Sequence, residues 1–283
     1  MSTQNAANNA SVMPPTFLAN ENGSQPRVGS LWSSMQEVCD LMQIPYLPGA
    51  GEDEQLFQHV QLKAGQRIHL IGQSFENLYL VRTGFLKTVM IDEVGNEQVM
   101  SFPMKGDMVG IDAICTNQYA TESVALTLCE VIVLPFKLLA RIVAAHFGME
   151  MTLHVMLSGE LVRQQNMVRL LTGLNAEMRV SHFLIALSER FAQMGYSSKR
   201  FSLRMTRQEI GSYLGMTLET VSRTLSALNE AGLITVEQRS IGIVDMQGLK
   251  GLRRLPVTDA RTKNPPRRHK KNKASVEAIM EAA

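Results

Sequence analysis

The stretch from Met205 to Val236 constrains the fold most strongly, because its capping, apolar and turn residues follow one another in a recognisable order. Thr206 and Glu209 have the spacing of a capping box, in which a hydroxyl and a carboxylate each accept a backbone N–H at the start of a helix. Ile210 and Leu214 then predict the inner, apolar face of that short helix.

A second helix is predicted directly after this one. Gly215 permits a tight turn, and Thr217 is placed to cap the N-terminus of the following helix. Gly232 ends that helix, and the segment 233–246 has the alternation and turn residues of a two-stranded β wing. The buried face of the second helix is predicted at Val221, Leu225 and Leu228. Two short capped helices, a glycine turn and a wing together predict a winged helix-turn-helix.

Three polar residues share the outer face at the start of this second helix. Glu219, Ser222 and Arg223 stand at i, i+3 and i+4, in the two turns that reach base edges in a recognition helix. Arg can bond guanine bidentately, Glu can accept from cytosine, and Ser can serve several partners. The alternative is an ordinary i,i+4 ion pair between Glu219 and Arg223 on a solvated face. Inside this motif we favour DNA readout.

Other residues of the motif are candidates for the DNA backbone. Arg207, Thr220 and Thr224 are predicted phosphate contacts, which position a protein without specifying sequence. Thr206 and Thr217, at the starts of the two helices, complete the predicted DNA-binding set.

The chain before this motif divides by its hydrophobic pattern. From about Leu56 to Phe136, short Val-, Ile- and Leu-rich segments punctuated by glycines predict an antiparallel β barrel or sandwich, with a hairpin turn at 92–96. Apolar residues then recur at three- and four-residue steps, which predicts an amphipathic helix from about Met149 to Leu171. A surface helix would explain this stripe, but a helix–helix dimer seam is favoured. The predicted seam residues are Leu153, Leu157, Leu161, Gln164, Val168 and Leu171.

Composition bounds the class of protein. The chain has 283 residues, of which 45% are hydrophobic and 19% charged, and this suits two modest globular domains. Three cysteines do not make a disulfide scaffold, no apolar run is long enough for a membrane span, and the N-terminus lacks the features of a secretory signal. We therefore expect a cytoplasmic protein. From Met246 onward ten Lys/Arg stand against three Asp/Glu, which indicates an anionic partner or a solvated tail.

The expected organisation has five parts and an α+β fold. We expect a disordered segment at 1–30, an antiparallel β-roll at 31–145, a long dimerisation helix at 146–174, a winged helix-turn-helix at 175–250 and a basic, disordered tail at 251–283.

This order, and the segment LYLVRTGFLKTVMIDEVGNEQVMSFPMKGDMVGIDAI, resemble the CRP/FNR family of bacterial transcription regulators over about residues 50–250. LETVSR, at 218–223, resembles the FNR-type recognition helix more than the CRP type. The resemblance implies a cyclic-nucleotide-binding-like β-roll, and a homodimer on an inverted repeat of TTGAT-like half-sites. It also implies a regulator that contacts RNA polymerase close to promoters; an activator is expected, and the sequence leaves repression open.

Two departures from the family matter. Iron–sulfur members carry a cluster of N-terminal cysteines, whereas residues 1–38 here contain none, and Gln43 stands where one ligand is expected. Cys39, Cys115 and Cys129 are interpreted as small structural residues, with Cys39 the best placed for redox chemistry because its surroundings look least buried. We expect no cofactor and no metal site.

The second departure concerns cyclic nucleotides, which CRP-type pockets hold with a Gly-Glu-Leu turn and an Arg-Ser pair. The corresponding stretches here are Gly110 to Asp112 and Tyr119 to Ser123, so the phosphate-binding arginine is missing. Arg82 is the arginine expected nearby, in a turn. The effector is therefore unknown.

Two other classes of function compete with this one. One is a small-molecule sensor that acts mainly through protein–protein contacts. The other is an enzyme, which we reject because the sequence holds no Ser/His/Asp order, no phosphate-cradling glycine loop and no HExxH motif.

Overall fold

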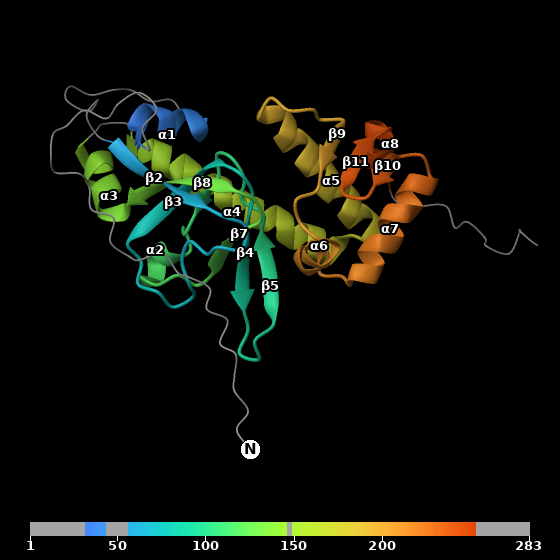
Figure 1. The fold of residues 1–283 in the computed structure, drawn as a ribbon, viewed down its shortest axis with the longest axis horizontal. Coiled ribbons are helices and arrows are strands. Elements are labelled where there is room, and N and C mark those ends of the chain that lie inside the picture. The colour runs from blue at the N-terminus through green and yellow to red at the C-terminus, as the bar shows by residue number, and fades with distance from the viewer. Residues whose placement is uncertain (1–31, 44–55, 146–148, 253–283) are drawn as a thin grey trace, which may run out of the picture.

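The computed structural model describes residues 32–43, 56–145 and 149–252, in two parts connected by a long helix (Figure 1). A β-roll forms one side of the molecule and a small helical part with a β wing forms the other. The segment 1–30, predicted to be disordered, and the basic tail beyond residue 252 lie outside the described residues. Within the described residues, no helix is long and apolar enough to cross a membrane.

The β-roll is built from short strands with three helices at its edges. Its elements are β1 (Trp32–Ser34), α1 (Met35–Leu41), β2 (Leu56–Leu62), β3 (Asn77–Thr83), β4 (Leu86–Ile91), β5 (Glu97–Ser101), β6 (Met108–Val109), α2 (Ala113–Thr116), β7 (Glu122–Ala125), β8 (Cys129–Pro135) and α3 (Phe136–Ala145). One sheet has the order β1-β2-β8-β3-β6 and a second has the order β5-β4-β7, with every described strand pair antiparallel. The antiparallel prediction is thus confirmed.

The hairpin between β4 and β5 turns where the sequence predicts. Gly95 has a φ of +91°, a conformation that costs glycine little, and Asp92 closes the turn by accepting from the backbone of Val94 and Asn96. This hairpin projects from the β-roll beside the helical part of the molecule (Figure 1).

Two apolar layers fill the β-roll. Between its sheets, side chains such as Leu62, Val81 and Val131 are completely buried. On the other face of the larger sheet, Leu78 and Ile132 pack beneath α1 and α3. Because strands buried on both faces need apolar residues at successive positions, NLYLV and VIVL carry continuous apolar runs instead of strict alternation.

A closed ring of polar side chains fastens α1 to the sheet. Ser33 donates to Glu37 at 2.7 Å and lies 2.6 Å from His59 Nε2, while His59 Nδ1 lies 2.9 Å from Glu130. Arg82 completes the ring with ion pairs to Glu37 at 2.9 Å and Glu130 at 2.8 Å. The prediction that Arg82 lies in a turn is wrong: it is on β3, with its guanidinium engaged by two carboxylates.

The second part starts after the long helix. Its elements are α4 (Met149–Gly173), α5 (Ala176–Gln193), β9 (Arg200–Ser202), α6 (Arg207–Leu214), α7 (Leu218–Glu230), β10 (Ile234–Glu237), β11 (Ser240–Ile243) and α8 (Met246–Gly251). α4 ends at Gly173, and Asn175 caps the following helix α5 by accepting from Met178 N at 2.9 Å. The wing sheet has the order β10-β11-β9, and the winged helix-turn-helix prediction is confirmed.

The two parts pack against each other through α6 and the β4–β5 hairpin. The Ser212 hydroxyl of α6 accepts from Val99 N of β5 at 2.9 Å, and Arg190 of α5 pairs with Asp107. Phe102 and Phe183 lie in one continuous apolar cluster that crosses the contact. The helix-turn-helix is therefore held against the β-roll by hydrogen bonds, ion pairs and apolar packing together.

Candidate nucleic-acid interface

The first helix of the motif begins with the predicted capping box. Thr206 Oγ1 accepts from Glu209 N at 3.1 Å, and Glu209 Oε2 accepts from Thr206 N at 2.7 Å. Burial alone would raise the pKa of Glu209, but hydrogen bonds from Thr206 and the charge of Lys87 outweigh it and lower that pKa. The inner face at Ile210 and Leu214 is buried, as predicted.

The turn between the helices depends on two glycines, of which the sequence indicated one. Gly215 takes a left-handed conformation with φ of +63° and caps α6. Gly211, inside α6, was not singled out, yet a Cβ there would lie 2.6 Å from Met216 O. Its position in the sequence could have indicated it, because Gly211 lies one helical turn before the tight turn at Gly215. The backbone after that turn packs back onto the helix at this point and leaves no room for a side chain.

Arg179 is a second residue that the sequence did not indicate. Its guanidinium donates to Leu171 O at 2.5 Å, to Leu174 O at 2.9 Å and to Leu214 O at 3.0 Å. These carbonyls lie at the ends of α4 and α6, which are otherwise unsatisfied in a helix. Arg179 thereby joins the end of the long helix to the end of the first helix of the motif.

The second helix, α7, presents the predicted outer face to solvent. Thr217 caps it by accepting from Thr220 N at 3.2 Å, and Val221, Leu225 and Leu228 are buried. Glu219 and Arg223 are exposed and Ser222 is half-buried, all near the N-terminus of the helix. The pKa of Glu219 is lowered by its own backbone N–H, by the Thr217 hydroxyl and by Arg223. The predicted set is thus on one accessible face, with a carboxylate ready to accept.

The other predicted DNA-binding residues divide into two groups. Thr206 is exposed, Arg207 and Thr220 are half-buried, and all three stand in the first turns of α6 and α7. Thr224 is 6% exposed and packs in the interior of the motif, so its prediction as a phosphate contact is wrong. The physical reason is the helical period, since Thr224 lies three residues after the buried Val221 and shares its face.

The wing adds a cation that the sequence pattern did not indicate. Gln238 has a φ of +54° at the turn between β10 and β11, and Arg239 beside it is exposed. Arg239 O accepts from Leu203 N at 2.8 Å, which anchors the backbone of the turn to the body of the motif. A guanidinium at the wing tip is therefore carried on an anchored loop.

The long helix α4 leaves apolar side chains in solvent. Of the predicted seam, Leu161 is 59% exposed and Val168 is 60% exposed, Gln164 is exposed, and Leu157 and Leu171 are half-buried. The Leu153 side chain lies outside the described residues. Val155 and Val162, which the prediction omitted, are exposed as well and widen the apolar surface.

The cysteines do not fit an iron–sulfur centre. Cys39 and Cys129 are buried in different apolar clusters, and Cys115 is exposed on α2. Among the described residues, no group of three or more His, Cys, Asp and Glu side chains could hold a metal ion. The prediction that Cys39 is the least buried cysteine is wrong: it is 3% exposed, and burial together with Asp40 raises its pKa to about 11.

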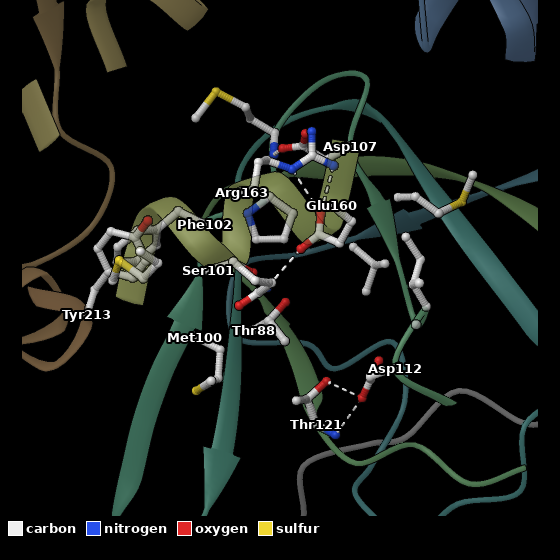
Figure 2. A pocket seen from close by; sticks show the side chains of 18 of the residues that line it. Thr88, Met100, Ser101, Phe102, Asp107, Asp112, Thr121, Glu160, Arg163 and Tyr213 are labelled. Atoms are coloured by element: carbon white, nitrogen blue, oxygen red, sulfur yellow. Dashed lines mark hydrogen bonds and ion pairs between the residues drawn. The ribbon is translucent and has the colours of Figure 1, made fainter. Parts of the chain in front are cut away.

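The position that corresponds to the cyclic-phosphate pair is occupied by the chain itself. Asp112 Oδ2 accepts from Ala120 N at 3.1 Å, from Thr121 N at 3.0 Å and from Thr121 Oγ1 at 3.0 Å (Figure 2). A carboxylate thus takes the N–H groups that a bound anion would need, and its charge repels a phosphate. Arg67, another β-roll arginine, is paired with Glu122 at 2.9 Å. These residues do not fit a cyclic nucleotide.

The fold and this surface define a class of protein: a cyclic-nucleotide-binding-type β-roll joined by a long helix to a winged helix-turn-helix. The family model of the Crp-like helix-turn-helix domain matches residues 178–252, and that of the cyclic nucleotide-binding domain matches residues 59–146.

Individual proteins give the same result. The transcriptional regulatory protein btr of Bordetella pertussis is 36% identical over 200 residues, which are 71% of this chain and 83% of that protein. The fumarate and nitrate reduction regulatory protein of Escherichia coli is 34% identical over 223 residues, which are 77% of this chain and 88% of that protein. The solved structure of FixK2 from Bradyrhizobium japonicum matches with a TM-score of 0.65 and 26% identity, covering 70% of this chain and 98% of that one. The chain belongs to the CRP/FNR family, and it is a DNA-binding transcription regulator of this type, not an enzyme.

Proposed function

We propose that the protein binds as a homodimer to an inverted repeat of two TTGAT-like half-sites and activates transcription there. The observation that carries this proposal is the accessible face of α7, where Glu219, Ser222 and Arg223 stand in the first two turns. The half-site follows from the resemblance of LETVSR to the FNR-type recognition helix.

Each residue of this face has a distinct role in the proposal. Arg223 binds the guanine of the half-site through O6 and N7, because a guanidinium matches those two acceptors. Ser222 helps to select the outer thymines, and Glu219 accepts from a base of the opposite strand. The position of Glu219 supports the last role, because its carboxylate is exposed near the N-terminus of α7 and accessible to a base.

The starts of the two helices hold the DNA backbone. Arg207 is the first residue of α6, and Thr206, Thr217 and Thr220 bring hydroxyls to the starts of α6 and α7. Helix N-termini favour anions because their backbone N–H groups and dipoles point outward. We infer that this set fixes the register of the protein on DNA without reading its sequence.

The dimer forms along α4 in this proposal. Leu161 and Val168 are seven residues apart, as are Val155 and Val162, and all four are exposed. A seven-residue repeat of apolar side chains is typical of paired helices. Glu160 does not oppose pairing strongly, because Arg163 lies 2.7 Å from its carboxylate and Gln164 donates to it at 2.8 Å. Dimer symmetry would place the half-sites about one helical turn apart.

The remaining partners follow from this activity. An activator bound near a promoter works by contacting RNA polymerase, and both DNA and polymerase place the protein in the bacterial cytoplasm.

Selection from a random DNA library tests the proposal. The wild type should enrich an inverted TTGAT-like repeat, and Arg223→Ala should weaken binding by about 1–3 kcal/mol and relax selection at the guanine. Arg207→Ala is the matched control, because loss of a phosphate contact should weaken all sequences alike and reduce the salt dependence. Ser222→Gly should move the preference toward the CRP-type half-site. If the wild type enriches no inverted repeat, or Arg223→Ala keeps the guanine, the proposal is wrong.

A further inference from the structure

A cavity of about 450 Å³ lies where the β-roll, α4 and the helix-turn-helix part meet (Figure 2). One wall comes from β4, β5 and the segment 102–112, and another comes from Glu160 to Met167 of α4. The third wall comes from α5 and α6, through Phe183, Ala186 and Tyr213 among others. The cavity includes Gly110 to Asp112 and Ala120 with Thr121, the positions that correspond to the cyclic-nucleotide contacts, and it extends from them to the contact with the DNA-binding part.

The charges of the lining disfavour an anionic occupant. Both arginines of the lining face carboxylates, since Arg190 pairs with Asp107 and Arg163 lies 2.7 Å from Glu160. Asp112 is a third lining carboxylate, so acidic groups outnumber basic ones. Figure 2 shows Asp107, Glu160 and Arg163 at one end of the cavity and Asp112 with Thr121 at the other. An anion would have to break an existing ion pair to find a cation, and that is unfavourable.

Apart from these charged groups, the lining is mostly apolar and rich in sulfur and aromatic rings. Phe102 and Tyr213 have ring centroids 5.1 Å apart, and Phe183 lies 5.8 Å from Tyr213. Thioethers are adaptable and make favourable contacts with aromatic rings. The hydroxyls of Thr88 and Ser101 add a few polar groups (Figure 2). Five methionines also line the space: Met90, Met100, Met104, Met108 and Met167.

We propose that this cavity binds a neutral aromatic molecule of one or two rings. Its volume falls at the lower end of the range for small-molecule sites, about 300–1,000 Å³, which suits a ligand of that size. The rings and thioethers of the lining contact the faces and edges of the ligand, and a hydroxyl of Thr88 or Ser101 meets its polar group.

A molecule bound there would bridge the two parts of the protein. It would contact β5 on one side and α5 and α6 on the other, and it would therefore stabilise the arrangement in which they are docked. Gln164 both lines the cavity and belongs to the proposed dimer seam, so occupancy would also reach α4. The effect of the ligand on DNA binding rests on the proposed function, whereas binding of the ligand rests on the cavity alone.

The test uses two probes with one ring system and different charge, 2-naphthol and 2-naphthoate. The full-length protein carries [¹³C]methyl-methionine, and the 18 methionines of the chain are followed by NMR during titration. We expect 2-naphthol to shift the resonances of the five lining methionines saturably, with each assigned by its Met→Leu variant. We expect 2-naphthoate to bind at least ten-fold more weakly, because the lining offers no unpaired basic group to its carboxylate.

Two alanines on one helix supply matched variants. Ala186 and Ala192 are both exposed on α5, but Ala186 lines the cavity and Ala192 does not. Ala186→Trp should fill the space and weaken 2-naphthol binding at least ten-fold, whereas Ala192→Trp should bind like the wild type. Met100→Trp fills the cavity from the opposite wall, which keeps the test available if Ala186→Trp fails to fold.

Absence of saturable shifts, equal binding of both probes, or unchanged binding in the filled variants would overturn the proposal. DNA binding of the same wild-type sample separates this outcome from failure of the proposed function. A protein that binds DNA but not 2-naphthol refutes the cavity site alone, and one that binds 2-naphthol but no DNA refutes the proposed function alone.

Discussion

The Lys87 ammonium of β4 lies 3.2 Å from the Glu209 carboxylate of α6, so one ion pair joins the β-roll to the capping box of the helix-turn-helix. Both side chains are largely shielded, at 16% and 17% exposure, and Glu209 also accepts from Thr206 N. Glu209 therefore serves two purposes at once: it starts α6 and it holds α6 against the β-roll.

Substitutions at Glu209 should separate these two roles. Glu209→Gln keeps an acceptor for the capping box and removes the charge that faces Lys87, while Glu209→Ala removes both. In a thermodynamic cycle with Lys87→Met, we expect Glu209→Gln to reveal a coupling of about 1 kcal/mol. Glu209→Ala should cost about 1 kcal/mol more in the free energy of unfolding, through loss of the cap. Additive effects of Glu209→Gln and Lys87→Met would show that the ion pair contributes nothing.

Arg179 should control the position of the helix-turn-helix relative to α4. Its guanidinium bonds the carbonyls of Leu171 and Leu174 near the end of α4 and also the carbonyl of Leu214, which is distant from them in the chain but lies beside them in the fold. Arg179→Met keeps much of the apolar stem but leaves these carbonyls without their donor. We expect a loss of about 2 kcal/mol in unfolding free energy, because hydrogen bonds to a charged group are lost.

DNA affinity of Arg179→Met should fall at temperatures at which the variant remains folded. The single ammonium of a lysine cannot reach all three carbonyls as the planar guanidinium of arginine does, so Arg179→Lys should recover only part of the stability. Arg204 is exposed in the same part of the protein and supplies the control: Arg204→Met should leave stability unchanged. Full recovery by Arg179→Lys would contradict the proposed geometry.

Acid should destabilise the β-roll through His69. This ring is completely buried and stacks on Tyr119, with centroids 4.0 Å apart. Burial lowers the pKa of His69 to about 4, although Asp112 and the Thr121 backbone oppose the shift. A histidine with a lowered pKa stays neutral in the folded protein, whereas the same histidine in the unfolded chain takes up a proton below about pH 6.5. The folded state is therefore fully stable above about pH 6.5 and loses stability as the pH falls toward 4. The linked loss is about 3 kcal/mol.

Chemical denaturation between pH 7 and 4 checks this effect. His69→Phe keeps the stacking and removes the proton site, so its unfolding free energy should fall less steeply with acid than that of the wild type. His182→Phe, at an exposed histidine of α5, controls for the loss of one histidine. Identical slopes for the wild type and His69→Phe would exclude His69 as the source.

A charge on α4 should separate the proposed dimer. Leu161 is 59% exposed on the stripe, and Leu161→Glu would bury an unpaired carboxylate against its symmetry mate. We expect sedimentation to show a shift toward monomer, by at least ten-fold in dimer affinity. Val94 is an apolar residue of the β4–β5 turn with 86% exposure, and Val94→Glu should leave the dimer intact. If Leu161→Glu remains as dimeric as the wild type, the seam lies elsewhere.

Much of the fold was predictable because its signals are local. The capping box of Thr206 and Glu209, the Gly95 turn and the break at Asn175 each depend on residues only a few positions apart. The hydrogen bonds and backbone conformations that form them involve only neighbouring residues, so a local sequence pattern is enough to predict them. The outer face of α7 was predictable for the same reason, because helical period alone separates it from the buried face.

Other parts of the site depend on residues that meet only after folding. Arg179 contacts Leu214, 35 positions later, and Ser212 contacts Val99, 113 positions earlier. No local pattern encodes such partners. Thr224 is a different case, because the period that places Val221 inside also places Thr224 inside, and its hydroxyl misled the prediction.

Cyclic AMP should not bind the protein with micromolar affinity. The backbone N–H groups of Ala120 and Thr121, which stand where the phosphate-binding pair is expected, already donate to Asp112. Calorimetry of the wild type should show no binding heat at micromolar nucleotide.

Ala120→Arg alone should not restore binding, because the new guanidinium would pair with Asp112. Combining Ala120→Arg with Asp112→Ala removes that competitor and frees both N–H groups, so only this double variant should gain measurable affinity. Micromolar binding by the wild type, or equal binding by the single and double variants, would show that Asp112 does not block the site.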